Sequence, residues 1–491
     1  MSKAKRVPHG LGTAVVAGMI ATTVLAACAT GPRFTPPPVP TVSSYVSSRA
    51  PKSHSEATSK PHGRSGEAAE QSVVLGMRPP ENWWTLLNSP QLDEVVALAL
   101  RNNLSLGIAR ANLARAQEGL AAAQGQRSVQ LDLASQVARN EYGSAFLGPE
   151  ASTFPTFSDY SVGPSVSYDL DIYGGLRHRI GQAGAIAGYE KQQLRAARLQ
   201  VLGDTLTEVL DIASARAQIR VIKRIVDADG KTVDLVRAAR RVGAVSDIDV
   251  LTAESQRDRD RTLLPPLYQE LDAARDALAI LVGQPPVKWT PHDFALDELS
   301  VPHELSLVVP SELVRARPDI RAAEAELRSA NATVGIATAD LYPQVSLTAG
   351  WAEQGLLTGG TAAAWDLIGG LTAPVFHGGT LRAQRRAAQD AYDATFLQYQ
   401  LVVLNAFGQV ADTLHSLDHD AQALRAQEQA VASAEATVLL TQQGYRVGNA
   451  GILQVVTAER ERQVAEIGLV QARARRVADT AALFLASGNG G

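Results

Sequence analysis

Four short segments of the chain alternate between apolar and polar residues, the pattern of a β-strand with one buried and one wet face. In the clearest segment, apolar side chains occupy every second position from Tyr160 to Ile172, with serine, glycine and aspartate between them. The other three segments repeat the alternation with more exceptions. We therefore expect strands near 128–142, 157–173, 342–356 and 363–376.

Two very long stretches without proline follow the second and the fourth expected strand, at about 176–242 and 381–447. At 1.5 Å per residue, each would form a helix of roughly 100 Å, longer than a compact domain is wide. Apolar residues in both stretches step by three and four, which is the heptad rhythm of a coiled coil. They are Leu199, Leu202, Leu206, Val209 and Ala213 in the first stretch, and Val403, Phe407, Val410, Leu414, Leu417, Ala421 and Leu424 in the second.

Both long helices are expected to end at a glycine, Gly243 or Gly448, because glycine adopts the left-handed conformation that stops a helix. A returning helix should then begin three residues later and complete a hairpin. Four residues occupy capping positions at these starts: Ser246 and Asp249 in the first half, Gly451 and Gln454 in the second.

The chain repeats itself. Arg241-Val242-Gly243, followed by Thr252-Ala253-Glu254, recurs about 205 residues later as Arg446-Val447-Gly448 and Thr457-Ala458-Glu459. A second match aligns Ala111, Leu113, Ala116 and Leu133 with Ala325, Leu327, Ala330 and Leu347. We interpret the chain as a tandem duplication. The expected parts are a first repeat at 81–285, an equatorial linker at 286–310, a second repeat at 311–486 and a tail at 487–491.

Four strands in one chain cannot close a membrane barrel, because the smallest closed membrane barrels have about eight. A trimer would supply about twelve, an even number that leaves no edge unpaired in lipid. The other interpretation of these segments is a small soluble sheet. The expected fold is mainly α with a β membrane part: a long antiparallel coiled-coil α-barrel and a trimeric, roughly twelve-stranded β-barrel.

The N-terminus has the features of an exported lipoprotein. A basic start precedes an apolar stretch over 11–25 that is too short and too rich in glycine and threonine for a membrane span. We expect a signal peptide over 1–27. The Leu25-Ala26-Ala27-Cys28 sequence looks like a lipobox, so Cys28 is predicted to carry a covalent lipid that holds the chain at a membrane. A structural, buried cysteine is the alternative.

The following segment, 28–80, is rich in proline, serine, threonine and lysine and has too few apolar residues for a core. It is predicted to be a lipid-anchored tether. Trp83 and Trp84 are expected to end it by docking on the folded body, because paired tryptophans rarely stay solvated.

The formal net charge of −4 argues against nucleic acid as a partner. A single cysteine excludes a disulfide framework and a thiolate zinc cluster. The sequence has no glycine-rich phosphate loop and no nucleophile elbow, so we predict no enzyme activity and no cofactor besides the lipid. His415 and His419 lie one helical turn apart beside Asp418, but on a heptad helix we expect a solvated face and no metal site.

Several motifs follow one another in a fixed order: Asn102-Asn103-Leu104, Tyr168-Asp169-Leu170-Asp171-Ile172-Tyr173-Gly174, Arg317-Pro318-Asp319-Ile320-Arg321-Ala322-Ala323-Glu324, Leu341-Tyr342-Pro343, Pro374-Val375-Phe376 and the two Arg-Val-Gly turns. Together, from Trp83 to Leu485, they resemble the TolC/OprM-like outer membrane factor family, in its NodT-type lipoprotein branch.

The resemblance implies the outer-membrane channel of a tripartite efflux pump, a passive trimeric exit duct for small molecules in the outer membrane of a Gram-negative bacterium. Its periplasmic hairpin tips would meet an adaptor (membrane fusion) protein that couples the duct to an inner-membrane RND-type transporter. By the family's pattern the tip residues are Arg241, Val242, Gly243, Arg446, Val447 and Gly448.

In the family, the returning helices narrow the closed pore with an apolar residue and acids. The matching positions here are Leu453, Gln454 and Thr457, with Asp249 at the place of Gln454 in the first half. Gln454 and Thr457 replace acids that are common in the family, so we do not expect a cation-selective acidic ring.

Two other functions fit the same pattern. The first is an outer-membrane duct of a type I protein secretion system, which a neighbouring ABC exporter gene would favour. The second is a non-porous, lipid-anchored coiled-coil scaffold, which would show no conductance in planar bilayers.

Overall fold

The computed structural model describes residues 30–38, 42, 44–46, 71–141 and 156–488. The predicted signal peptide, Cys28 and residues 489–491 of the predicted tail lie outside the described residues. The chain divides into two compact units. The strand unit comprises residues 1–37, 113–190 and 322–399, and the hairpin unit comprises residues 38–112, 191–321 and 400–491.

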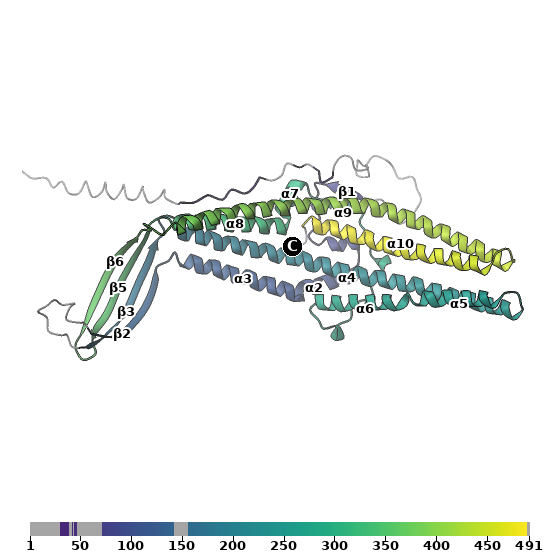
Figure 1. The fold of residues 1–491 in the computed structure, drawn as a ribbon, viewed down its shortest axis with the longest axis horizontal. Coiled ribbons are helices and arrows are strands. Elements are labelled where there is room, and N and C mark those ends of the chain that lie inside the picture. Colours follow the sequence, from purple (N-terminus) through teal and green to yellow (C-terminus); the bar gives the residue numbers. More distant parts are fainter. Residues whose placement is uncertain (1–29, 39–41, 43, 47–70, 142–155, 489–491) are drawn as a thin grey trace, which may run out of the picture. The chain divides into compact units, whose positions relative to one another are not determined.

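The strand unit contains one antiparallel sheet of four strands (Figure 1). Its strands are β2 (Gln130–Asn140), β3 (Phe157–Leu170), β5 (Gln344–Leu356) and β6 (Thr361–Thr372). The order is β2-β3-β5-β6, so each half of the chain supplies one strand pair and β2 and β6 form the edges. The four predicted strands are confirmed.

The register places the predicted apolar positions on one face of this sheet. Leu131 pairs with Val166, Val166 with Ala349, and Ala349 with Leu367. In a single chain this face is open: Trp365, for example, is 78% exposed. A continuous apolar surface of this kind needs lipid or another protein surface to cover it.

Two helices of 67 residues follow the strand pairs, α4 (Gly175–Arg241) and α9 (Thr380–Arg446). They confirm the predicted long helices almost to the residue. The heptad positions are buried where the helices enter the hairpin unit. These buried residues are Leu202, Leu206, Val209 and Ala213 in α4, and Val403, Val410, Leu414, Leu417 and Leu424 in α9.

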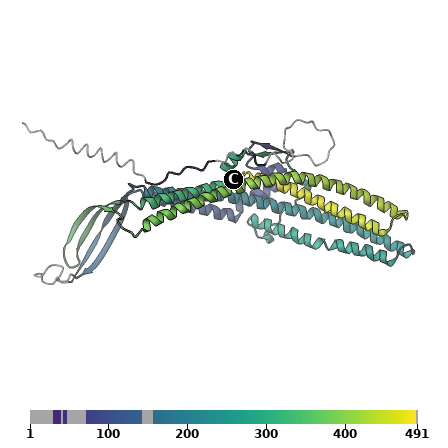
Figure 2. The ribbon, with the colours of Figure 1, turned by 45° about the horizontal axis from the view of Figure 1, so that its top comes forward.

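Short helices precede each strand pair: α2 (Pro90–Asn102) and α3 (Leu104–Gly125) in the first half, α7 (Pro310–Ala316) and α8 (Pro318–Ala339) in the second. The returning helices are α5 (Asp247–Arg261), α6 (Leu264–Leu281) and α10 (Ile452–Ala486). Figures 1 and 2 both show α5 running beside α4 and α10 beside α9.

The prediction of one returning helix per half is wrong for the first half. The break between α5 and α6 falls just before Pro265 and Pro266. Proline lacks the N–H that continues a helix and disfavours helical backbone in the residue before it. No proline occurs in α10, which runs without interruption.

The predicted tether contains a strand that its composition did not suggest. Strand β1 (Ser72–Leu75) pairs in parallel with β4 (Glu304–Leu307), which lies in the predicted linker together with two short 3₁₀ helices. Trp83 begins a further 3₁₀ helix, is fully buried and stacks on Phe484 with ring centroids 5.0 Å apart. The predicted docking of this tryptophan is confirmed.

Candidate functional site

Two of the family-like motifs meet where the strands pass into the helices of the strand unit. Tyr173 stacks on Tyr342, with ring centroids 4.9 Å apart and planes 15° apart. The Asp171 carboxylate accepts hydrogen bonds from the backbone N–H groups of Leu176 (2.9 Å) and Arg177 (2.7 Å) in the first turn of α4. A carboxylate there satisfies free N–H groups and complements the helix dipole. These motifs therefore fix how α4 leaves the sheet.

In the hairpin unit, one polar side chain in each half holds the end of that half's returning helix. Asn103, between α2 and α3, donates Nδ2 to the carbonyl of Leu281 at 2.9 Å. Arg317, between α7 and α8, donates Nη1 to the carbonyl of Ala486 at 2.8 Å. Leu281 and Ala486 are the last residues of α6 and α10. We call Asn103 and Arg317 the helix-end locks.

A glycine accompanies each helix-end lock. Gly283 and Gly488 have φ values of +73° and +75°. A Cβ on Gly283 would lie 2.6 Å from the carbonyl oxygen of Asn102, and one on Gly488 would lie 2.9 Å from the Cα of Arg317. Only glycine allows both the left-handed backbone and this close approach. Gly488, which lies in the predicted tail, therefore provides the tight turn after α10 at the end of the second repeat.

The second lock is charged and better connected than the first. Arg317 is 8% exposed and donates to both carboxylate oxygens of Asp319 (3.0 and 2.6 Å) and to Oε1 of Gln409 (2.8 Å). Asn103 instead uses its Oδ1 to accept from the N–H groups of Ser105 and Leu106 at the start of α3. The motifs indicated a family resemblance, but they did not predict which distant residues Asn103 and Arg317 would bind.

The two predicted hairpin tips have the same backbone. Gly243 and Gly448 have φ values of +76° and +77°. The N–H of Ala244 donates to the carbonyl of Ala239, and that of Asn449 to the carbonyl of Gly444, which is the hydrogen bonding of a glycine-terminated helix. The predicted stop at a left-handed glycine is confirmed. The valines before these glycines, Val242 and Val447, are 79% and 71% exposed.

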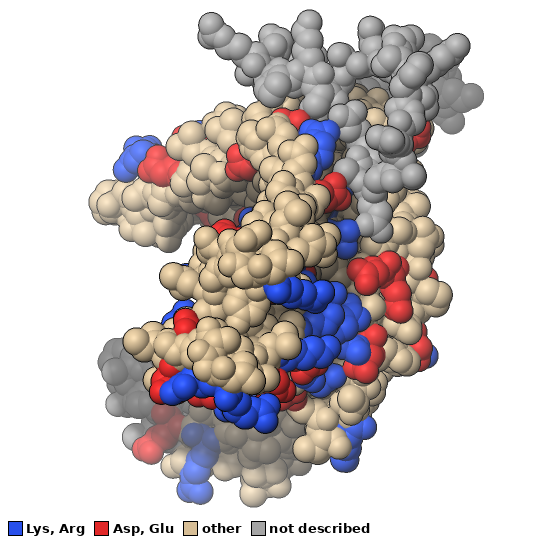
Figure 3. Space-filling view, turned by 90° about the vertical axis from the view of Figure 1, so that its right-hand side faces the viewer, with Lys and Arg blue, Asp and Glu red and all other residues tan. Residues whose placement is uncertain are grey.

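The side chains beside the two tips differ in charge. At the first tip, Arg240 pairs with Asp247 (2.7 Å) and Arg237 with Glu254 (3.0 Å). The hydrogen bond and charge of Arg240 lower the pKa of Asp247. In the second half, Gln442 donates to Glu459 (2.8 Å) at the places of Arg237 and Glu254. Figure 3 faces the side of the hairpin unit where the tips lie and shows lysine and arginine gathered on part of it.

The predicted constriction residues of α10 lie on one exposed face. Leu453 is 65% exposed, and Gln454 and Thr457 are exposed beside it. The opposite face of α10 is buried, where Ile452 and Val455 pack against Val233, Val236 and Ala253.

The capping predictions are confirmed in full for the first half. The Asp249 carboxylate accepts from the N–H and the Oγ–H of Ser246, and the Ser246 Oγ accepts from the N–H of Asp249. The hydrogen bonds from Ser246 lower the pKa of Asp249. In the second half, Gly451 has no side chain, so only the bond from its N–H to Gln454 Oε1 (3.1 Å) forms.

His415 and His419 are exposed on α9. In the part of the chain that the structure describes, no group of three or more histidine, cysteine, aspartate or glutamate side chains is arranged to hold a metal ion. None of the described helices combines the length and the hydropathy that a membrane-crossing helix needs.

Comparison with known proteins identifies the family to which the chain belongs. The family described as outer membrane efflux protein matches residues 95–284 and 309–489. The chain belongs to the outer membrane efflux protein family. Its members are transport proteins of the outer membrane, which confirms the predicted family, efflux function and location.

Particular relatives support the same class. The pyoverdine export outer membrane protein OpmQ of Pseudomonas aeruginosa is 28% identical over 83% of this chain and 87% of its own length. Nodulation protein T of Rhizobium leguminosarum bv. trifolii is 25% identical over 95% of both chains. Among solved structures, VceC of Vibrio cholerae is 26% identical, with a TM-score of 0.77 over 84% of this chain and 99% of its own. The outer-membrane channel OprN shares the fold at 24% identity, with a TM-score of 0.82 over 94% of this chain and 99% of its own.

Proposed function

We propose that three copies of the chain assemble into one tube that conducts small molecules passively from an inner-membrane pump to the outside. The strands would form a membrane barrel of about twelve strands, and the long helices would continue it as a periplasmic duct. The chain itself catalyses nothing in this scheme.

The open sheet carries this proposal. Within the described residues, β2 and β6 each keep one edge without a strand partner, and the apolar face of the sheet is exposed. Unpaired backbone N–H and C=O groups are too costly to leave in lipid, so the edges of neighbouring copies must pair. Three sheets of four strands close such a ring, whereas one sheet cannot.

A tandem duplication accounts for the shared construction of the two halves. Turns, helix-end locks and the glycines beside them recur at matching places, which supports descent of both halves from one ancestral unit.

A lipid on Cys28 would anchor the tube. Thr30, two positions later, bonds to the end of the first strand pair: its N–H and Oγ–H both reach the carbonyl of Tyr173, at 3.2 and 2.9 Å. The ring Nε2 of His178 lies 2.8 Å from the carbonyl of Thr30. These contacts would hold a lipidated N-terminus close to the strands, where the membrane would be.

The hairpin tips would contact a periplasmic adaptor protein, which would couple the tube to an inner-membrane RND-type transporter. The exposed Val242 and Val447 would supply apolar contacts, flanked by Arg241 with Gly243 and by Arg446 with Gly448. The constriction would involve Leu453, Gln454 and Thr457, together with Asp249. The relatives named for pyoverdine export and for toluene efflux support small molecules as cargo.

In-cell crosslinking tests the adaptor contact. Cysteines would replace Ala244 or Asn449 at the tips, with Gln269→Cys on the exposed surface of α6 as the matched control. We expect a bifunctional thiol reagent to join both tip variants, and not the control, to one adaptor protein. Equal products from all three variants, or none from the tips, would count against the proposal.

A further inference from the structure

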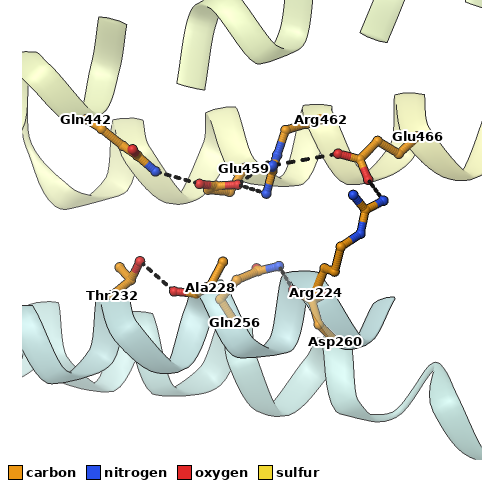
Figure 4. Close-up of polar contacts among 9 residues, drawn as sticks. All are labelled: Arg224, Ala228, Thr232, Gln256, Asp260, Gln442, Glu459, Arg462 and Glu466. Atoms are coloured by element: carbon orange, nitrogen blue, oxygen red, sulfur yellow. Dashed lines mark hydrogen bonds and ion pairs between the residues drawn. The ribbon is translucent and has the colours of Figure 1, made fainter. Parts of the chain in front are cut away.

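A buried acidic cluster joins three helices next to the small apolar core that lies behind the tips. Farther from the tips than this core, the contact among α4, α5 and α10 becomes polar (Figure 4). The polar residues there are each at most 6% exposed: Asp229 on α4, Gln256 and Asp260 on α5, and Glu459 and Gln463 on α10. Carboxyl groups rarely occupy such positions unless they are paired.

Hydrogen bonds and ion pairs satisfy most of the cluster. Asp260 accepts from Gln256 Nε2 at 2.9 Å. Glu459 accepts from Gln442 Nε2 at 2.8 Å and pairs with Arg462 at 2.7 Å. Arg462 also approaches Glu466 (3.7 Å). Glu466 in turn pairs with the largely exposed Arg224 (3.2 Å).

Asp229 is the exception. The residue is only 6% exposed, and its buried Oδ2 has no hydrogen-bond donor among the described residues. A buried carboxylate without a donor is strongly disfavoured. A proton removes the difficulty, because a protonated carboxyl group can donate to a neighbouring carboxylate.

The electrostatics agree with this geometry. Burial is the largest cause that raises the pKa of Asp229 to about 7; a hydrogen bond from protonated Asp229 to Asp260 and the negative charges of Asp260 and Glu459 act in the same direction. The charge of Arg462 opposes the shift and does not cancel it. Asp260 is the charged group that faces Asp229 from α5, and Glu459 and Arg462 are the charged groups that face it from α10.

We propose that Asp229 and Asp260 share one proton when α4, α5 and α10 are packed together, and that losing this proton loosens the helices behind the tips. The chain would thereby carry a pH-sensitive contact close to its hairpin tips. The inference concerns packing within one chain, so it goes beyond the proposed tube and does not depend on it.

The direction of the effect follows from linkage. The pKa of Asp229 is higher in the packed state than its ordinary value, so packing is favoured at low pH and weakens as pH rises toward about 7. Loosening would admit water and return the pKa to its ordinary range. Opening should therefore be about tenfold more frequent at about pH 8 than at about pH 6.

A second buried carboxyl pair would produce a similar pH dependence, so the test has to remove its contribution. Between α9 and α10, burial and a hydrogen bond with Asp479 raise the pKa of Asp420 to about 7, against the charges of Arg475 and Arg476. The test therefore uses the full-length lipoprotein with Asp420→Asn as its background. Asp229→Asn is the test variant. Asp227→Asn, which alters an exposed aspartate two positions away on α4, is the matched control.

Hydrogen exchange of peptides from α5 and from the start of α10 would be measured at about pH 6 and pH 8 and corrected for intrinsic rates. We expect the background and the Asp227→Asn protein to open about tenfold more at the higher pH, and the Asp229→Asn protein to show a ratio near one. The same ratio in all three proteins would overturn the proposal.

Infrared spectroscopy provides an independent readout. At about pH 6 the background protein should show a protonated-carboxyl band that Asp229→Asn and Asp260→Asn each remove, and that Asp227→Asn retains. A band that persists in both cluster variants, or no band in the background protein, would refute the shared proton. Because two different substitutions are used, misfolding of one leaves the test intact.

Discussion

The hairpin of α4 and α5 and the hairpin of α9 and α10 turn alike but differ in their surroundings. Both end in a left-handed glycine with the same backbone hydrogen bonds. The first tip is flanked by two arginine–carboxylate pairs, while the matching pair in the second half is Gln442 with Glu459. The backbone geometry is thus fixed by the same means twice, and the side chains around it are free to diverge. Such divergence would suit two tips that meet different surfaces of a partner.

The locks show the same division between a shared position and a different chemistry. Asn103 and Arg317 hold equivalent helix ends, but only Arg317 is charged, and its additional partners are the side chains of Asp319 and Gln409, whereas those of Asn103 are backbone N–H groups. The first returning helix is interrupted before Pro265, whereas α10 is continuous. The second half therefore holds the end of one continuous returning helix with a charged lock, whereas the first half holds the end of its second returning helix, α6, with a neutral lock.

The largest expected effect comes from removing the locks. Arg317→Ala should cost about 3 kcal/mol of unfolding free energy, because it leaves the Ala486 carbonyl and Gln409 without their charged donor. Asn103→Ala, which loses one long-range bond and the cap of α3, should cost about 2 kcal/mol. Denaturant titration of the full-length protein checks both. A larger loss of unfolding free energy in Asn103→Ala than in Arg317→Ala would contradict the expectation that the second lock contributes more stability.

The glycines beside the locks should instead behave alike. Gly283→Ala and Gly488→Ala each force a side chain onto a left-handed backbone and into a close contact, at an expected cost of about 2 kcal/mol. The same titration applies. A tolerated alanine at one of the two sites would mean that this part of the repeat is not equivalent in the two halves.

The smallest effects concern the helix starts at the tips. Ser246→Ala removes a cap and should cost about 1 kcal/mol, whereas Gly451→Ser adds the missing cap and should stabilise by a few tenths of a kcal/mol. Gly451 has an ordinary backbone (φ −88°) and open space where a Cβ would stand. Hydrogen exchange in the first turns of α5 and α10 measures both. Destabilisation by Gly451→Ser would show that the second tip rejects a cap for another reason.

Local patterns were sufficient to predict most of the fold. Alternation located the strands, the absence of proline located α4 and α9, and Gly243 and Gly448 located the turns. The pairing of β1 with β4 was not predictable, because each strand is four residues long and their partners are far apart in sequence. The lock partners were hidden for the same reason.

One residue of the buried acidic cluster could have been predicted from the sequence. Asp229 occupies the buried stripe of α4 together with Ile225, Val233 and Val236. A carboxylate at a core position of a heptad helix suggests a buried polar contact. Its partner Asp260 could not be identified from spacing, because Asp260 lies on another helix whose packing only the structure fixes.

The mass of the assembly tests the central claim most directly. The protein, extracted from membranes in mild detergent, would be measured by native mass spectrometry. The account predicts a particle of three chains, because the edges of a four-stranded sheet must pair with neighbouring copies in lipid. A stable, fully folded particle of one chain would contradict it.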